Sequence, residues 1–139
     1  FYIDSLELEM YNKSKSYFNS AIYKKAQEIG MLSKHISDCL NTDLAPLSEN
    51  GQENPDVYFS GDIVQHSILL STELLKAEAS SFSEKKYFHA HTLDWLTYRL
   101  TQNCKRLEHC SSNGRDFLLI LKKEIKKFKK LQKQWMLTL

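Results

Sequence analysis

The side chains of this chain that could act on a substrate or hold a metal are its histidines and cysteines. His35 and Cys39 are four residues apart, which is the spacing of two metal ligands on one face of a helix. His109 and Cys110 would have to complete the site, but adjacent residues on a helix point about 100° apart. Because the sequence also has no CxxC or HxxxH motif, we expect no metal site. Cys39 and Cys104 are expected to be small buried apolar residues.

Motifs for catalysis are missing from the sequence as well. It has no phosphate-binding glycine loop, no dinucleotide-binding fingerprint and no GxSxG nucleophile motif. A cysteine nucleophile would need a base arranged beside it, and no residue spacing specifies one. We therefore expect a protein that is not an enzyme and that uses no cofactor.

The strongest chemical signal is a basic helix face near the end of the chain. At about 100° per residue, the apolar residues of segment 116–139 fall on one half of a helix and its lysines on the other. We call the second half the lysine face; it consists of Lys122, Lys123, Lys126, Lys127, Lys129, Lys130 and Lys133. Such a face attracts phosphates, acidic protein segments or anionic lipids. A solvated outer face of a bundle helix is the simplest interpretation.

The distribution of charge makes this end of the chain distinctive. From residue 115 onward there are eight basic and two acidic residues, whereas the first 114 residues hold 11 basic and 15 acidic ones. The net charge of +2 and the isoelectric point of about 8.4 hide this asymmetry. An acidic partner would be steered to the basic end.

A second candidate surface is aromatic. Tyr87, His91, Trp95 and Tyr98 follow one another at spacings of four, four and three, so they lie on one side of a helix, which we call the aromatic face. Tyr and Trp are typical anchor residues of protein interfaces. The alternative is that residues 56–59 or a neighbouring helix cover them.

The elements that position these residues are expected to be helices. Only four glycines and two prolines occur, and long stretches lack both. The apolar periodicity predicts an all-α antiparallel four-helix bundle with helices at about 5–40, 62–80, 82–110 and 114–138 and one long loop at 41–61. A single helix over 62–110 is an alternative, and the loop is long enough for a simple turn or a crossover.

Glu124 stands out on the last helix because it lies on the apolar half. An unpaired carboxylate in an apolar seam is costly. In an antiparallel bundle in register it would lie level with Ser33, Ser71 and Gln102, and we expect a polar layer there that fixes the register.

The size of the chain predicts one domain over residues 1–139. It begins with Phe1 rather than Met, so we expect a fragment of a larger protein. No apolar run approaches the roughly 18–20 residues of a membrane span, and an odd number of cysteines favours reduced thiols. These features predict an intracellular protein, without distinguishing nucleus from cytoplasm.

The two unexplained surfaces together favour one class of function. We expect a non-enzymatic module for protein–protein interaction or assembly, in which the aromatic face supplies contact energy and the lysine face orients an acidic partner. A second copy of the chain is another candidate partner. The alternative function is binding of nucleic acid or an anionic membrane surface through the lysine face.

Overall fold

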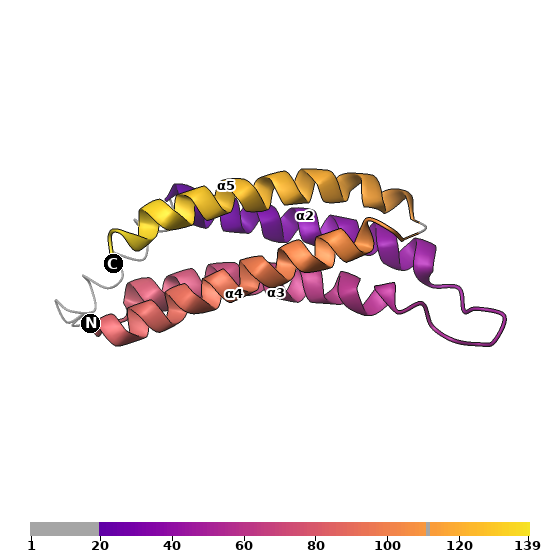
Figure 1. Ribbon diagram of the computed structural model, residues 1–139, viewed down its shortest axis with the longest axis horizontal. Coiled ribbons are helices and arrows are strands. Elements are labelled where there is room, and N and C mark those ends of the chain that lie inside the picture. The colour runs from indigo at the N-terminus through magenta and orange to yellow at the C-terminus, as the bar shows by residue number, and fades with distance from the viewer. Residues whose placement is uncertain (1–19, 111) are drawn as a thin grey trace, which may run out of the picture.

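The computed structural model describes residues 20–110 and 112–139, and this part of the chain forms an all-α antiparallel four-helix bundle without strands (Figure 1). The predicted fold class is therefore confirmed. The elements are α2 (Ala21–Leu44), α3 (Asp56–Ala79), α4 (Ser83–Leu107), the 3₁₀ helix η1 (Asn113–Phe117) and α5 (Leu118–Met136). The portion of the first predicted helix at 5–19 lies outside the described residues.

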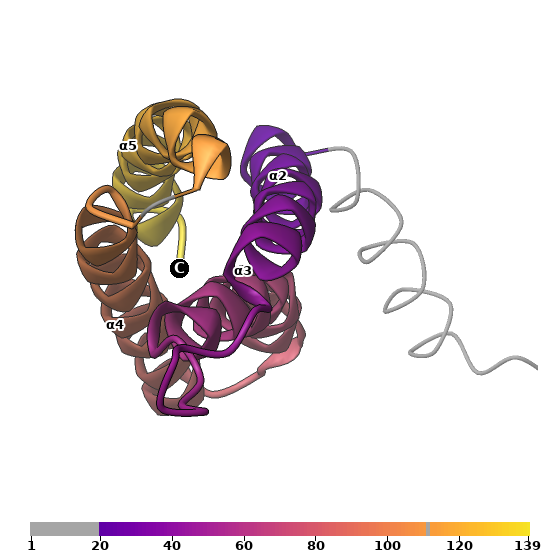
Figure 2. The ribbon, with the colours of Figure 1, turned by 90° about the vertical axis from the view of Figure 1, so that its right-hand side faces the viewer.

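The four helices surround one core in the order of the chain. Each packs on the next, and α5 returns to pack on α2; seen from one end, they enclose a common centre (Figure 2). The loop between α2 and α3 joins neighbouring helix ends at one pole of the bundle (Figure 1). This connection is the simple turn, not the crossover.

The predicted loop at 41–61 is too long, because helix occupies both of its ends. α2 continues to Leu44, whose buried side chain extends the apolar stripe of α2 by one more turn. α3 begins six residues before position 62: the Asn54 side chain accepts a hydrogen bond from the Asp56 N–H at 3.0 Å, and Val57 and Phe59 pack against the core. This hydrogen bond, from the residue before the N-cap Pro55, and the two apolar contacts accompany the early start of the helix, which leaves Asp62 inside it.

The predicted break between the helices at 62–80 and 82–110 is present. α3 ends at Ala79 and α4 begins at Ser83, so the alternative of one helix over 62–110 is wrong. α4 ends at Leu107 rather than 110, and α5 begins at Leu118 after the 3₁₀ turn rather than at 114. Ser112 starts that turn by accepting a hydrogen bond from the Gly114 N–H at 3.0 Å.

The core of α2 and α4 follows the predicted apolar stripes, but that of α3 does not. The spacing from residue 62 onward predicts a buried stripe of Val64, Ile68, Leu75, Ala79 and Phe82, whereas Ile68 and Phe82 are exposed and Ile63, Leu70 and Leu74, expected only at the edge of the stripe, are buried.

The largest fully buried side chains of the core come from all four helices and are Ile29, Ile36, Leu40, Ile63, Leu70, Leu74, Leu93, Leu96, Leu100, Leu107, Leu118 and Phe128. Two buried serine pairs join α2 to α3 within this core: Ser33 with Ser67 at 2.7 Å, and Ser37 with Ser60 at 2.8 Å.

The polar layer expected around Glu124 does not form. The Glu124 side chain is 18 % exposed at the edge of the seam between α2 and α5, where its carboxylate lies 2.6 Å from Lys25 Nζ. Ser33 is bonded to Ser67 instead, and Ser71 accepts from the Gln27 side chain. The rotation of α5 brings Glu124 to a lysine at the surface rather than to hydroxyl groups in the interior.

Candidate functional site

The aromatic face lies on the water-exposed side of α4. Tyr87, Trp95 and Tyr98 are 49 %, 54 % and 58 % exposed, and His91 is exposed as well. Residues 56–59 do not cover them, because that segment is the first turn of α3 and its Phe59 packs under Arg106. The four side chains are thus available on one surface of the folded domain.

Phe88 belongs beside this face, and sequence reasoning missed it. Its side chain is 65 % exposed. Phe88 precedes Trp95 by seven residues, which places the two rings on the same side of α4. The spacing of seven residues between Phe88 and Trp95 could have identified Phe88 from the sequence, although Phe88 is not part of the series with spacings of four, four and three that defines the aromatic face.

The rotation of α4 is set by its contacts with α3. The His89 Nδ1 lies 2.5 Å from a Glu73 carboxylate oxygen, and the Arg106 guanidinium stacks over the Phe59 ring at 3.8 Å. These two contacts lie near opposite ends of α4. They hold its apolar stripe against the core and therefore turn the aromatic face toward water.

A third contact between these helices involves the aromatic face itself. The Trp95 ring meets the His66 ring edge-on, with centroids 5.5 Å apart. Burial lowers the pKa of His66, and the nearby Arg99 charge lowers it further, against an opposing effect of Asp62. The neutral imidazole is therefore favoured beside Trp95, and one edge of the indole is fixed while the rest stays exposed.

The lysine face divides into paired and unpaired side chains. Lys122 is half-buried and lies 2.6 Å from the Glu108 carboxylate of α4, while Lys127 lies 3.1 Å from Glu124. Five further lysines are exposed, and no described carboxylate lies within ion-pair distance of them: Lys123, Lys126, Lys129, Lys130 and Lys133. The positive charge free to act on a partner is smaller than the sequence alone indicates.

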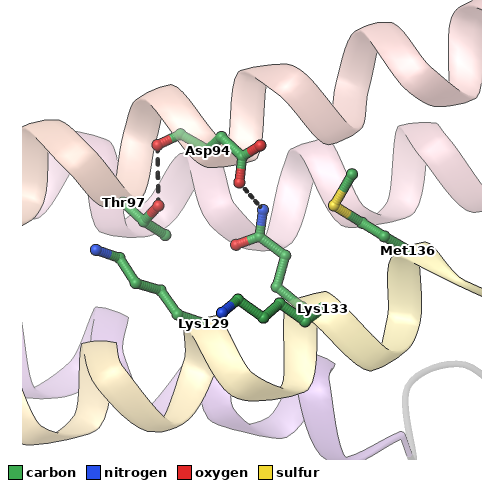
Figure 3. Close-up of a pocket in the computed structure, with 6 residues that line it drawn as sticks. Asp94, Thr97, Lys129, Lys133 and Met136 are labelled. Atoms are coloured by element: carbon green, nitrogen blue, oxygen red, sulfur yellow. Dashed lines mark hydrogen bonds between the residues drawn. The ribbon is translucent and has the colours of Figure 1, made fainter.

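The two faces meet at a pocket between α4 and α5 of about 250 Å³. Its lining residues are Asp94, Thr97, Lys129, Gln132, Lys133 and Met136. The Lys129 side chain extends from α5 toward Thr97 on α4, and Lys133 lies beside it (Figure 3). Asp94 is three residues after His91 and four before Tyr98, so the pocket borders the aromatic face.

Gln132 forms the floor of this pocket and was not singled out from the sequence. Its side chain is 2 % exposed. The Nε2 group donates to the Asp94 carboxylate at 2.6 Å, whereas the Oε1 atom is buried without a hydrogen-bond partner in the described residues. A glutamine on the apolar half of a helix was the signal that could have drawn attention to it.

The histidines and cysteines considered for metal binding do not come together in one site in the described part of the chain. His35 packs edge-on against Phe117, with ring centroids 5.9 Å apart. Cys104 is fully buried, and burial raises the pKa of its thiol to about 12. Within residues 20–110 and 112–139, no three His, Cys, Asp or Glu side chains lie close enough together to hold a metal ion.

Comparisons with protein-family models, with curated proteins and with solved structures find no match to this chain. Among the helices that the structure describes, none combines the length and the apolar character that crossing a membrane requires.

Proposed function

We propose that this domain is a non-enzymatic protein–protein interaction module that binds an acidic partner across α4 and α5. The observation that carries the proposal is the outward position of the aromatic face next to unpaired lysines. The aromatic rings supply contact energy, and the lysines orient the partner.

The binding free energy would come mainly from apolar surface that is exposed to water in the free domain and becomes buried against the partner. Exposed rings that become buried at an interface contribute about 25 cal/mol per Å² of apolar surface. Trp and Tyr are suited to this role because they bury a large area with few rotatable bonds. Trp95 has the further advantage that its contact with His66 holds one edge of the ring before a partner arrives.

The lysines contribute mainly orientation and rate of association. Charges at the rim of an interface change the association rate and its salt dependence more than the final affinity. Lys129 and Lys133 are the lysines that line the pocket beside the aromatic face. They would place acidic side chains of the partner next to Tyr98, one helical turn from Asp94.

Nucleic acid or anionic lipid is the competing partner. The carboxylate of Asp94 lies in the pocket where the two surfaces meet, and it repels phosphates and acidic side chains alike. The absence of arginine from α5 likewise removes bidentate contacts to both groups. The observation that favours a protein is the exposed aromatic face, which a protein partner would bury, and the experiment below separates the two classes.

The test is affinity capture from nuclease-treated cell extract with the whole chain as bait. We expect Trp95→Ala with Tyr98→Ala to lose a defined set of captured proteins. The matched control is Met31→Ala with Ile68→Ala, which removes exposed apolar side chains from α2 and α3 and should retain that set. Equal capture by both variants would contradict the proposal.

Salt and nuclease provide the second readout. Binding through phosphates falls steeply between about 50 and 200 mM salt, whereas an interface anchored by aromatic rings loses less. If material is captured from untreated extract but not from nuclease-treated extract, or if it consists of anionic lipid, the lysine face binds phosphates and the alternative function is correct.

A further inference from the structure

We propose that, in the absence of its acidic partner, the aromatic face is covered by the same face of a second copy of the chain, in a reversible antiparallel dimer of α4 on α4. This inference rests on the proposed function, because it adds a regulation of the same surface: the two copies must separate before the partner binds.

The exposed side of α4 carries a coiled-coil pattern over three heptads. The pattern begins at Glu84 and continues, at alternating spacings of four and three residues, with Phe88, His91, Trp95, Tyr98, Gln102 and Lys105. All seven side chains are exposed, and we call this series the outer seam. Residues at this alternation form one line of contact when two helices wind around each other.

The outer seam lies on the side of α4 opposite the core. Leu93 and Leu100 are fully buried, and Trp95 is about 200° from Leu93 at 100° per residue. α4 packs on α3 and α5, and in the end-on view no other described helix lies outside it (Figure 2). A helix of a second copy can therefore lie along the outer seam without displacing the described core.

The exposed aromatic area is of the size that a weak dimer needs. Tyr87, Phe88, Trp95 and Tyr98 are each about half to two-thirds exposed. An aromatic side chain has about 150–250 Å² to bury, so each ring leaves about 100 Å² in water. Four rings thus supply about half of the roughly 800 Å² per partner that is typical of a stable interface. We expect a reversible dimer, not a permanent one.

Charge sets the direction of the pairing. Glu84 and Lys105 lie at opposite ends of the outer seam, and no described side chain lies within ion-pair distance of either. A parallel pair would place like charges beside each other at both ends, and like charges across an interface repel. An antiparallel pair brings Glu84 of each copy to the end that carries Lys105 of the other. Two-fold symmetry makes this attraction occur twice.

The rings match one another in the antiparallel direction. When Phe88 faces Tyr98 of the second copy, the alternation of four and three places His91 opposite Trp95 of that copy. Each of these pairs occurs twice because of the two-fold axis. In the same alignment Glu84 faces Gln102 of the second copy, and Lys105 lies one helical turn further on, within reach of the Glu84 carboxylate.

Asp94 is the acidic side chain nearest to the two-fold axis. Its carboxylate accepts a hydrogen bond from Gln132 of α5 at 2.6 Å. The group is therefore directed along the surface of its own bundle toward α5, and away from Asp94 of the second copy. Like-charge repulsion at the centre of the dimer is small for this reason.

The experiment is analytical ultracentrifugation of the whole purified chain. A reducing agent is present, because Cys39 is only half-buried and a disulfide would otherwise join two copies. At about 100 µM protein we expect a mass approaching twice the 16.3 kDa of the chain, and at about 1 µM a mass close to that of one chain. A single-chain mass at both concentrations would overturn the proposal.

Aromatic variants locate the contact on α4. Phe88→Ala with Trp95→Ala removes two rings of the outer seam and should weaken self-association about tenfold or more. Met31→Ala with Ile68→Ala removes exposed apolar side chains from α2 and α3, and should leave the mass unchanged. Circular dichroism checks that both variants are folded. Equal masses for the two variants would contradict a contact through α4.

Charge reversal tests the antiparallel direction with side chains that play no part in the core. Glu84→Lys and Lys105→Glu should each weaken the dimer about fivefold at low salt, and the double variant should recover the affinity of the wild type. Lys123→Glu makes the same change of charge at an exposed position on α5 and should alter the affinity by less than about twofold. A double variant no tighter than the single ones would rule out antiparallel pairing.

Affinity capture then separates this inference from the proposed function, with the chain itself left out of the captured set. If the chain is monomeric but Trp95→Ala with Tyr98→Ala loses the captured proteins, the dimer is wrong and the interaction module stands. If the chain dimerises through α4 but the aromatic variant loses no protein, the proposed function is wrong and the dimer stands.

Glu84→Lys tests whether the dimer regulates the surface, because it opens the dimer and leaves every aromatic side chain in place. At bait concentrations where the wild type is dimeric, we expect this variant to capture about twofold more of the partner proteins. Unchanged or lower capture would show that the second copy and the partner do not compete, and the regulation proposed here would be wrong.

Discussion

The Lys25 ammonium of α2 lies 2.6 Å from the Glu124 carboxylate of α5, and this ion pair joins the first and last helices of the described bundle. Glu124 also accepts from Lys127 at 3.1 Å, and Lys25 reaches Glu28 at 2.6 Å. The hydrogen bond from Lys25 is the main cause that lowers the pKa of Glu124. The same bond raises the pKa of Lys25 above its ordinary value.

We predict that Glu124→Gln lowers the free energy of unfolding by about 1 kcal/mol, because it removes an ion pair whose two side chains are less than one-fifth exposed. Lys127→Gln is the control, since its side chain is 63 % exposed, and it should cost less than about 0.5 kcal/mol. Urea unfolding followed by circular dichroism measures both. Equal losses in the two variants would show that the contact across the helices contributes nothing of its own.

The contribution of this pair should also depend on pH at both ends of the scale. Because the folded pKa of Glu124 is lower than its ordinary value of 4.5, its stabilisation is present above that value and is lost as pH falls through the folded pKa. Because the folded pKa of Lys25 is higher than 10.5, its stabilisation is lost as pH rises through that pKa. The difference in unfolding free energy between wild type and Glu124→Gln should therefore be constant near neutral pH and shrink in acid and in strong base. A difference that grows in acid would contradict this assignment.

The buried serine pair between α2 and α3 should show strong coupling. Ser33→Ala leaves the Ser67 hydroxyl buried without its partner at 2.7 Å, and we predict a loss of about 1–2 kcal/mol in unfolding free energy. The double variant Ser33→Ala with Ser67→Ala should lose no more than the single one, since no polar group is then left unpaired. Ser81→Ala, at an exposed position in the turn, is the control. Additive losses in the double-mutant cycle would mean that the two hydroxyl groups do not depend on each other.

Two glycines should respond to alanine in opposite directions. Gly30 lies inside α2 with open space around its Cα, so Gly30→Ala should raise the free energy of unfolding by about 0.5–1 kcal/mol. A Cβ at Gly114 would lie 3.3 Å from atoms of Cys39 and Leu40 and 3.2 Å from Ser112 Oγ. Gly114→Ala should therefore lower stability by about 1–3 kcal/mol. Thermal unfolding of the two variants gives the comparison, and a stabilised Gly114→Ala would show that this turn has room to spare.

The three free cysteines should differ in reactivity in the folded protein. Cys104 is fully buried and the pKa of its thiol is raised to about 12, so its thiolate is scarce at pH 8. Cys39 is only half-buried, and we predict that a thiol reagent modifies it first. Mass spectrometry of partly labelled protein locates the modified residue, and unfolding in urea should equalise the rates. Labelling of Cys104 as fast as Cys39 before unfolding would contradict the burial of α4 against the core.

The aromatic face could be located from the sequence, because Tyr87, Trp95 and Tyr98 repeat at helical spacing. Whether other parts of the protein cover these side chains could not be predicted from the sequence. Coverage depends on the rotation of α4, which the His89–Glu73 and Arg106–Phe59 contacts set. Each contact joins residues that are far apart in the sequence. The sequence predicts the start of α3 too late for a similar reason. Val57 and Phe59 follow a loop rich in polar residues, and only the tertiary structure shows that they pack against the core.

The sequence by itself determined the fold class and the buried faces of α2 and α4, but it misplaced the buried face of α3, where Ile68 is exposed and Leu70 is buried. Ile29, Ile36 and Phe128 repeat with their neighbours at a helical period that buries one face of each helix, and this depends only on local spacing. The tertiary structure decided which polar groups meet: Glu124 with Lys25, and Gln132 with Asp94. Those pairings depend on how each helix is rotated and shifted along its neighbours. A rotation or shift by one residue or one turn changes the pairings but leaves the apolar spacing within each helix the same.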